Sequence, residues 1–298
     1  MRWKLAMAAL AASWGLISVL AAAVELDAAP LAFLRLALGA ATVAALAVAL
    51  GGWSRLRPHG RLPALALLGA VHGVHWLLFF EAVKLGSVAL ASITFYTAPV
   101  WLAVVAPLVL RERLSRVALL ALVPGAIGVA LVALTGVEGG GRFSLVAVLT
   151  GLGSAATYAV FVIGSKRLLR LRLDPISLTF WDTLFGAAVV APALLAADRV
   201  LPGSVGDWAS VLALGAVFSG IATVVYAVVL RRITAQTAGI LTFLEPVSAV
   251  VLAALLLGQS MGVGAVLGGA LVLLAGLVVI AFEPDDAGAA SHVGSASP

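Results

Sequence analysis

The chain has 298 residues, of which 63% are hydrophobic and only 10% are charged, and its mean hydropathy is +1.18. A soluble domain carries about 25% charged residues, so a water-soluble core is excluded and lipid is the expected solvent. The chain contains no cysteine, which excludes disulfides, thiolate metal sites and cysteine nucleophiles. The net charge of +5 is spread over short clusters between apolar runs, a pattern that argues against a nucleic-acid partner.

Long apolar segments separated by charged or turn-rich breaks fill the chain, and each is about 20 residues long, as a bilayer crossing requires. Segments this long and uniformly apolar predict α-helices rather than the alternating strands of a barrel. In chain order, the predicted spans are residues 4–24, 29–50, 62–83, 88–110, 115–135, 143–165, 175–197, 207–230, 236–257 and 262–282.

The first span also resembles a signal peptide, because Arg2 and Lys4 precede an apolar run that ends in alanines. The run is long for a signal peptide and another span follows at once, so we predict an uncleaved first helix. With the N-terminus placed inside, 14 of the 18 basic residues fall on the inner side. The positive-inside rule therefore predicts that both termini are cytoplasmic.

One segment of the chain occurs twice. Residues 84–114 and 231–261, which are offset by 147 positions, are identical at eight of 31 positions, and Pro99 aligns with Pro246. A duplication of this kind predicts two related halves.

Each half contains five spans, and an odd number of spans makes the two halves cross the membrane in opposite senses. The sequence thus predicts an all-α integral membrane protein, with ten transmembrane helices arranged as two inverted five-helix repeats around a central cavity. The first repeat is residues 1–137 and the second is residues 138–283, and residues 284–298 are predicted to form a disordered cytoplasmic tail.

Pro99 and Pro246 fall near the centres of their helices. Because proline has no N–H, the carbonyls of Phe95 and Thr242 lose their helical donors, and in hydrocarbon such groups need another partner. Two kinked helices that line a polar cavity are one interpretation, and ordinary kinks packed against neighbours are the other. The symmetric placement favours the cavity.

Aromatic and polar side chains recur at mid-depth in several spans. In the third span, His72, His75, Trp76 and Phe79 share one helix face, because they are spaced i, i+3, i+4 and i+7. A metal site at the two histidines is not expected, since no third ligand is evident. We predict that the substrate-binding residues are Trp14, His75, Phe79, Tyr96, Trp101, Tyr158, Trp181 and Tyr226.

Charged side chains inside the spans cost about 3 kcal/mol at the bilayer centre. Glu81 and Lys84 lie near the outer end of the third span and can pair with each other at i, i+3. We expect Arg35 to snorkel to the outer interface, whereas Asp182 lies deeper. Glu245 lies at mid-depth beside the second proline, and it is either a proton-coupled carboxylate or a residue that braces the kink.

Several short motifs carry a family resemblance. They are Ser13-Trp14-Gly15, Pro30 followed by Arg35, Ala98-Pro99 ahead of Arg111-Glu112-Arg113-Leu114, and Leu244-Glu245-Pro246. Together they resemble the EamA-type, ten-helix branch of the drug/metabolite transporter superfamily over nearly the whole chain. Where that family usually has a glutamate, this chain has Gln259, which weakens any charged role for that position.

The third span, with His72-Gly73-Val74-His75-Trp76, Phe80-Glu81-Ala82 and then Tyr96, is most similar to bacterial amino acid exporters of the YddG type. This resemblance implies export of aromatic and other apolar amino acids across the bacterial inner (plasma) membrane. It also implies a basket in which spans 1, 3, 4, 6, 8 and 9 surround the cavity. Because Glu245 belongs to a motif that is widespread in the family, the resemblance favours the bracing role for it.

The sequence favours a secondary active or facilitative carrier that exports small metabolites, above all amino acids, by alternating access. No phosphate-binding loop of the GxxxxGK[ST] kind is present, so ATP is not expected to drive transport, and no cofactor is expected. A proton-coupled exporter of drugs or organic cations is the alternative, with Glu245, Asp182 or Glu81 as its carboxylate.

An enzyme is not expected, because no motif supplies a nucleophile and a base, and a channel or structural protein is less favoured than a carrier. The expected partners are a small-molecule substrate and the lipid bilayer. The small-residue faces at Gly69–Gly73 and Gly264–Gly268 are explained by packing within a monomer.

Overall fold

The computed structural model describes residues 1–85, 88–113, 115–135, 145–257 and 262–283. Gln259 and the predicted tail at 284–298 lie outside these residues. Within the described residues, ten helical segments are long and apolar enough to span a membrane, which confirms the predicted number. They are Arg2–Ala21, Ala28–Ala49, Leu62–Leu85, Ile93–Leu110, Arg116–Leu134, Leu145–Arg170, Pro175–Ala196, Val205–Leu230, Ala235–Leu256 and Val263–Phe282.

The fourth, seventh, eighth and ninth spans are each built from consecutive shorter elements, and the other spans are single helices. In chain order the elements are α1 (Arg2–Ala22), α2 (Ala28–Ala49), η1 (Trp53–Leu56), α3 (Leu62–Leu85), α4 (Val88–Phe95), α5 (Ala98–Leu110), α6 (Arg116–Thr135), α7 (Leu145–Arg170), α8 (Pro175–Val190), η2 (Ala191–Ala196), α9 (Val205–Leu212), η3 (Ala213–Ile221), α10 (Ala222–Leu230), α11 (Ala235–Leu241), α12 (Leu244–Leu257) and α13 (Val263–Phe282).

The two mid-span prolines coincide with helix breaks. The fourth span breaks between α4 and α5, and Pro99 lies at the start of α5. The ninth span breaks between α11 and α12, with Pro246 in the first turn of α12. Proline is tolerated in a first turn, where its missing N–H has no helical acceptor. At the second break, the Thr242 carbonyl accepts a hydrogen bond from the Glu245 N–H at 3.0 Å, which restores the partner that the proline removed.

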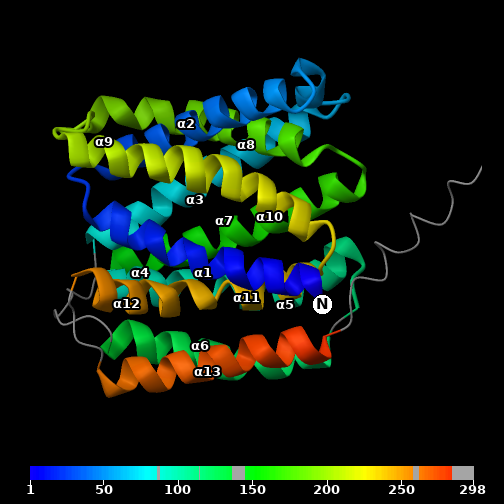
Figure 1. Cartoon of the computed structure of the whole chain (residues 1–298), viewed down its shortest axis with the longest axis vertical. Helices are drawn as coiled ribbons and strands as arrows, with labels where there is room; N and C mark the ends of the chain where they lie inside the picture. Colours follow the sequence, from blue (N-terminus) through cyan, green and yellow to red (C-terminus); the bar gives the residue numbers. More distant parts are fainter. Residues whose placement is uncertain (86–87, 114, 136–144, 258–261, 284–298) are drawn as a thin grey trace, which may run out of the picture.

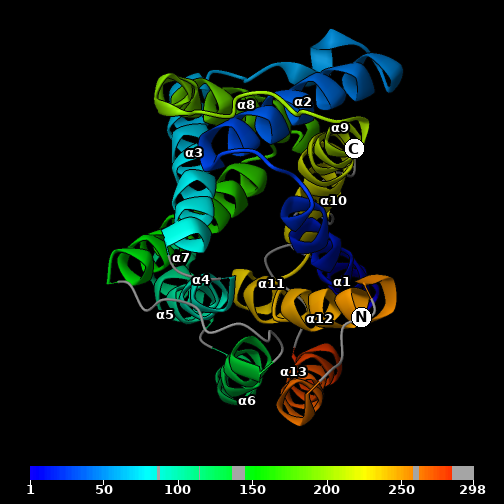
Figure 2. The same ribbon diagram turned by 90° about the vertical axis from the view of Figure 1, so that its left-hand side faces the viewer.

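The helices pack with a two-fold relation between the halves. In Figure 2, where α6 and α13 are seen nearly end-on, these two helices pack together at one side of the bundle, and the other spans surround its centre. Helix α3 packs on α8 and α2 packs on η3, while α1 packs on α12 and α7 packs on α4 and α5. Each span of the first half can be replaced by its counterpart in the second half, and the reverse. The contact of α3 with α8 then becomes that of η3 with α2, and the contact of α1 with α12 becomes that of α7 with α4 and α5. Since five is odd, the two repeats are inverted.

Two glycine crossings show the same relation at atomic scale. A Cβ on Gly73 of α3 would lie 2.5 Å from the carbonyl oxygen of Gly186 in α8. A Cβ on Gly220 of η3 would lie 3.4 Å from the carbonyl oxygen of Gly39 in α2. Each residue of one pair is 147 positions from a residue of the other, which is the offset of the sequence repeat. These spans therefore approach closely because glycine has no side chain at the crossing.

The two described ends of the chain lie at the same end of the bundle (Figure 1). The Lys4 ammonium donates to the carbonyl oxygen of Glu283, which ties α1 to the residue that follows α13. The sixth span continues to Arg170, past its predicted end at 165, because its basic side chains find buried partners at this end. Lys166 donates to the carbonyl of Leu230 at 2.8 Å.

Candidate functional site

A cavity lined by side chains from several spans lies among the helices. Spans 1, 3, 4, 6, 8 and 9 contribute to it, and so does the second span through Arg35. The lining side chains are Trp14, Ile17, Arg35, His72, His75, Trp76, Phe79, Phe95, Tyr158, Phe161, Phe218, Ser219, Thr223, Tyr226, Thr242 and Glu245.

Five of the residues selected from the sequence come together at this cavity: Trp14, His75, Phe79, Tyr158 and Tyr226. The rings of Trp14 and Tyr226 lie 5.6 Å apart between centroids, and those of His75 and Tyr158 lie 5.3 Å apart. The helix-face argument placed His75 and Phe79 together on α3. Their partners on α1, α7 and α10 are brought in by the packing of the spans.

His75 is fixed in place at the cavity wall. Only 1% of the residue is exposed. Its Nδ1 lies 3.0 Å from the hydroxyl oxygen and 3.1 Å from the carbonyl oxygen of Ser154 on α7. Because Nδ1 of His75 contacts Ser154 on α7, His75 joins α3 to α7 as well as lining the cavity.

Tyr96 lies behind the lining, at the break between α4 and α5. It is 7% exposed, and its ring centroid lies 5.0 Å from that of Phe95 and 6.2 Å from that of Phe243. Phe243 is its equivalent in the second repeat, so the two rings meet where the broken spans cross. The Tyr96 hydroxyl interacts with the Glu245 carboxyl.

Two selected tryptophans, Trp101 and Trp181, are not among the residues that line the cavity. Trp101 lies on the outer side of α5 with 46% of its surface exposed, because the inner side of that helix is taken by residues such as Leu102. Trp181 packs on Phe185 of the same helix, and its indole N–H donates to the Leu56 carbonyl at 2.7 Å. It therefore holds the short helix η1 against α8.

The sequence analysis expected Arg35 to snorkel to a membrane interface, but the side chain is instead buried. It is 2% exposed. Its guanidinium carbon lies 3.9 Å from the centre of the Trp76 ring, and its Nε donates to the Ser219 hydroxyl at 3.3 Å. The close crossing of α2 with η3 turns this face of α2 inward, and cation–π contact in a water-poor site compensates part of the cost of burying the charge. Arg35 is the main site residue that we did not select from the sequence.

The offset of the repeat is a signal in the sequence that could have pointed to Arg35. Asp182 lies 147 positions later, so the two repeats carry charged residues at equivalent positions. Asp182 is fully buried on α8. The indole N–H of Trp76 donates to Nε2 of His72 at 2.9 Å, so Nδ1 of His72 carries the proton and donates to Oδ1 of Asp182 at 2.6 Å.

A further correction concerns the end of the bundle away from the start of the chain. Lys84 does not pair with Glu81. Instead, its ammonium donates to Oδ1 of Asp27, just before α2, at 3.1 Å. Oδ2 of Asp27 accepts from the backbone N–H groups of Arg199 at 3.2 Å and Asp198 at 2.8 Å. The bond from Arg199, followed by that from Lys84, lowers the pKa of Asp27 below its ordinary value.

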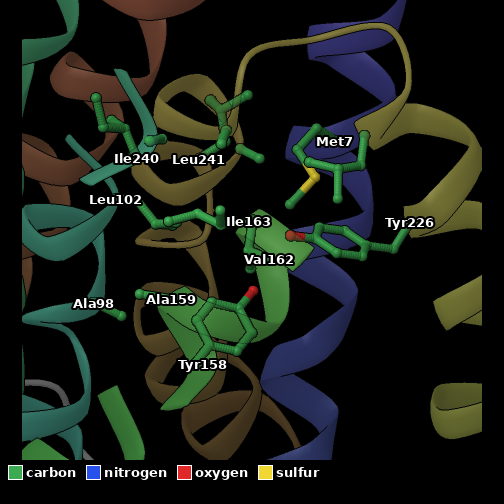
Figure 3. Packing of buried hydrophobic residues seen from close by; sticks show 14 of the residues in the cluster. Met7, Ala98, Leu102, Tyr158, Ala159, Val162, Ile163, Tyr226, Ile240 and Leu241 are labelled. Atoms are coloured by element: carbon green, nitrogen blue, oxygen red, sulfur yellow. The ribbon is translucent and has the colours of Figure 1, made fainter. Parts of the chain in front are cut away.

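Buried apolar side chains pack together beside Tyr158 and Tyr226 (Figure 3). The hydroxyl groups of Tyr158 and Tyr226 turn toward one another at the edge of this layer. The remaining side chains come from α1, α5, α7 and α11, and all are at most 6% exposed: Met7, Leu102, Val162, Ile163, Ile240 and Leu241.

Ten spans, an inverted repeat with two broken helices and a central cavity define a multi-pass membrane transporter. The chain belongs to the EamA-like transporter family, whose model matches residues 1–134 and again residues 145–282. It is therefore a transporter and not an enzyme.

Two relatives are themselves uncharacterized. An uncharacterized transporter of Archaeoglobus fulgidus is 28% identical over 201 residues, which are 67% of this chain and 70% of the relative. The uncharacterized transporter YxxF of Bacillus subtilis is 24% identical over 181 residues, 60% of this chain and 57% of the relative. A protein of known crystal structure shares the fold, with a TM-score of 0.77, 21% identity and coverage of 93% of this chain and 94% of the other.

Proposed function

We propose that the protein exports amino acids with aromatic or other apolar side chains across the bacterial inner membrane, in the manner of YddG-type exporters. The observation that carries this proposal is the composition of the cavity wall. Rings of Trp14, Trp76, Phe79, Phe95 and Tyr158 line the cavity. Such a wall favours an apolar or aromatic group, and polar side chains among the rings can orient a charged end.

The proposed mechanism is alternating access by two inverted repeats, residues 1–137 and 138–283, acting within a monomer whose termini are both cytoplasmic. The two broken spans cross beside the cavity, where their half-helices can move separately. Closing the apolar layer around Met7 and Leu241 seals the proposed cytoplasmic side, and opening it admits the substrate. Pro99 and Pro246 fix the points at which the broken spans bend.

A proton-coupled exporter of drugs or organic cations is the second candidate, and one observation favours it. Glu245 lines the cavity at the break of the ninth span. A carboxyl group at this depth can bind a cation and release it when protonated. In the first candidate, the same residue braces the helix break through its neighbour Tyr96.

Counterflow in liposomes distinguishes the two candidates. Liposomes that contain the purified protein are loaded with unlabelled tryptophan. Uptake of labelled tryptophan and of a lipophilic cation is then measured with and without a pH gradient. The first candidate predicts saturable tryptophan exchange, with competition by other apolar amino acids in a panel of twenty. The second predicts gradient-driven cation transport that Glu245→Gln abolishes. Absence of tryptophan exchange, with cation transport present, overturns the first candidate.

A further inference from the structure

One charged side chain at the cavity has unused hydrogen-bonding capacity. Arg35 is 2% exposed and lines the cavity, yet among the described residues its Nη1 has no hydrogen-bond partner. Its Nε donates to the neutral Ser219 hydroxyl at 3.3 Å. Leaving a buried guanidinium N–H unsatisfied is costly, because a charged donor loses its hydration without replacement. A ligand that supplies an acceptor would remove this cost.

The inverted repeat provides an internal comparison. Arg35 and Asp182 occupy equivalent positions, and so do Ser219 and His72, since each pair differs by 147 positions. In the second repeat, the carboxylate of Asp182 is bound by His72 at 2.6 Å and does not line the cavity. In the first repeat, the serine in the place of histidine offers no counter-charge. The two halves thus place opposite charges at matching sites, and the hydrogen-bonded partner can take a charge at Asp182 but not at Arg35.

The guanidinium is held in one orientation by residues behind it. The Trp76 ring lies 3.9 Å under its central carbon, and the indole N–H of Trp76 is bonded to His72, which is bonded to Asp182. This series of contacts joins α2, α3 and α8. Because stacking on the ring leaves the edge of a guanidinium available, its N–H groups remain free to bind a carboxylate in its plane.

We propose that Arg35 binds the carboxylate of the transported molecule, so that the site selects aromatic or apolar compounds that carry a carboxylate over amines that lack one. This inference rests on the proposed function, since it assigns the acidic end of an amino acid to a named residue. Glu245 lines the same cavity and attracts the Arg35 guanidinium across it, but in the described part of the chain Nη1 of Arg35 has no hydrogen-bond partner. Glu245 is then available to the ammonium group of a zwitterion.

The test compares ligands that differ only in their charged ends. Tryptophan, tryptamine (no carboxylate) and indole-3-propionate (no ammonium) are each added to purified protein, and binding is read from the rise in the thermal midpoint. The parent is expected to bind tryptophan and indole-3-propionate, but tryptamine about 10- to 100-fold more weakly, as expected for the loss of a charge-assisted hydrogen bond. Arg35→Gln should bind the two carboxylates as weakly as tryptamine.

A matched control is Arg199→Gln, because Arg199 is an exposed arginine in an outer loop and should leave all three affinities unchanged. The inference is overturned if the parent binds tryptamine as tightly as tryptophan, a result that needs no folded variant. It is also overturned if Arg35→Gln keeps the preference for carboxylates. If indole-3-propionate binds through Arg35 while tryptophan neither binds nor exchanges, the amino acid function fails and the role of Arg35 stands.

Discussion

A buried cluster of charges joins both repeats at the end of the bundle where the chain begins. Oε1 of Glu112 accepts from Arg170 at 2.9 Å and lies 4.0 Å from the Lys166 ammonium, and its Oε2 accepts from the Ala235 N–H at 3.1 Å. The side chains of Lys166 and Glu112 are 0% and 1% exposed. The cluster therefore connects the ends of the fourth and sixth spans to the start of the ninth.

Replacing Glu112 with alanine removes the carboxylate that lies beside the buried Lys166 ammonium. Breaking a buried ion pair from one side costs about 3 to 5 kcal/mol. We take about 3 kcal/mol, because Arg170 is 31% exposed and water reaches part of the cluster. Since 1.4 kcal/mol is a factor of ten, the closed arrangement of this end should lose about 100-fold in its equilibrium against the open one.

The assay uses the absence of cysteine from the chain. A single cysteine at Ile240, which is 2% exposed in the apolar layer of Figure 3, reports opening by its rate of reaction with a maleimide. Glu112→Ala should raise that rate by about 100-fold. In the control Glu25→Ala, which breaks an ion pair whose side chains are 78% and 63% exposed, the rate should not change. Equal rates in the two variants would refute the reasoning.

Three further predictions concern packing, pH and the cavity wall. Gly73→Ala should destabilise the purified protein by about 1 to 3 kcal/mol in thermal unfolding, because its Cβ overlaps the neighbouring backbone, whereas Gly206→Ala, whose Cβ meets nothing closer than 3.7 Å, should be neutral. The lowered pKa of Asp27 means that its contacts contribute stability above pH 3.8 and lose it as the pH falls through the folded-state value. Asp27→Asn should therefore lower the unfolding midpoint at neutral pH, and the difference from the parent should vanish in acid; a difference that persists there contradicts the assignment. Trp14→Ala should weaken transport by up to about tenfold, while Trp101→Ala should transport like the parent in the same counterflow assay; equal losses would place Trp101 in the substrate path.

The helix breaks show how far local chemistry predicts structure. A proline removes an N–H wherever it stands, so the interruptions near Pro99 and Pro246 followed from the sequence. The partner of Lys84 did not follow, because it depends on which loop lies beside the third span. Asp27 is 57 positions away and reaches Lys84 only through packing. Trp181 likewise meets η1, more than a hundred positions earlier in the chain.

The sequence by itself determined the ten spans and their inverted arrangement, because a bilayer sets the length of each helix and an odd-numbered duplication sets its direction. It left open the rotation of each helix about its axis, since these helices are apolar on every side and hydropathy does not tell inside from outside. Close crossings such as Gly39 with Gly220 fixed that rotation. They turned Arg35 into the cavity, and packing of the inner side of α5 left Trp101 facing outward.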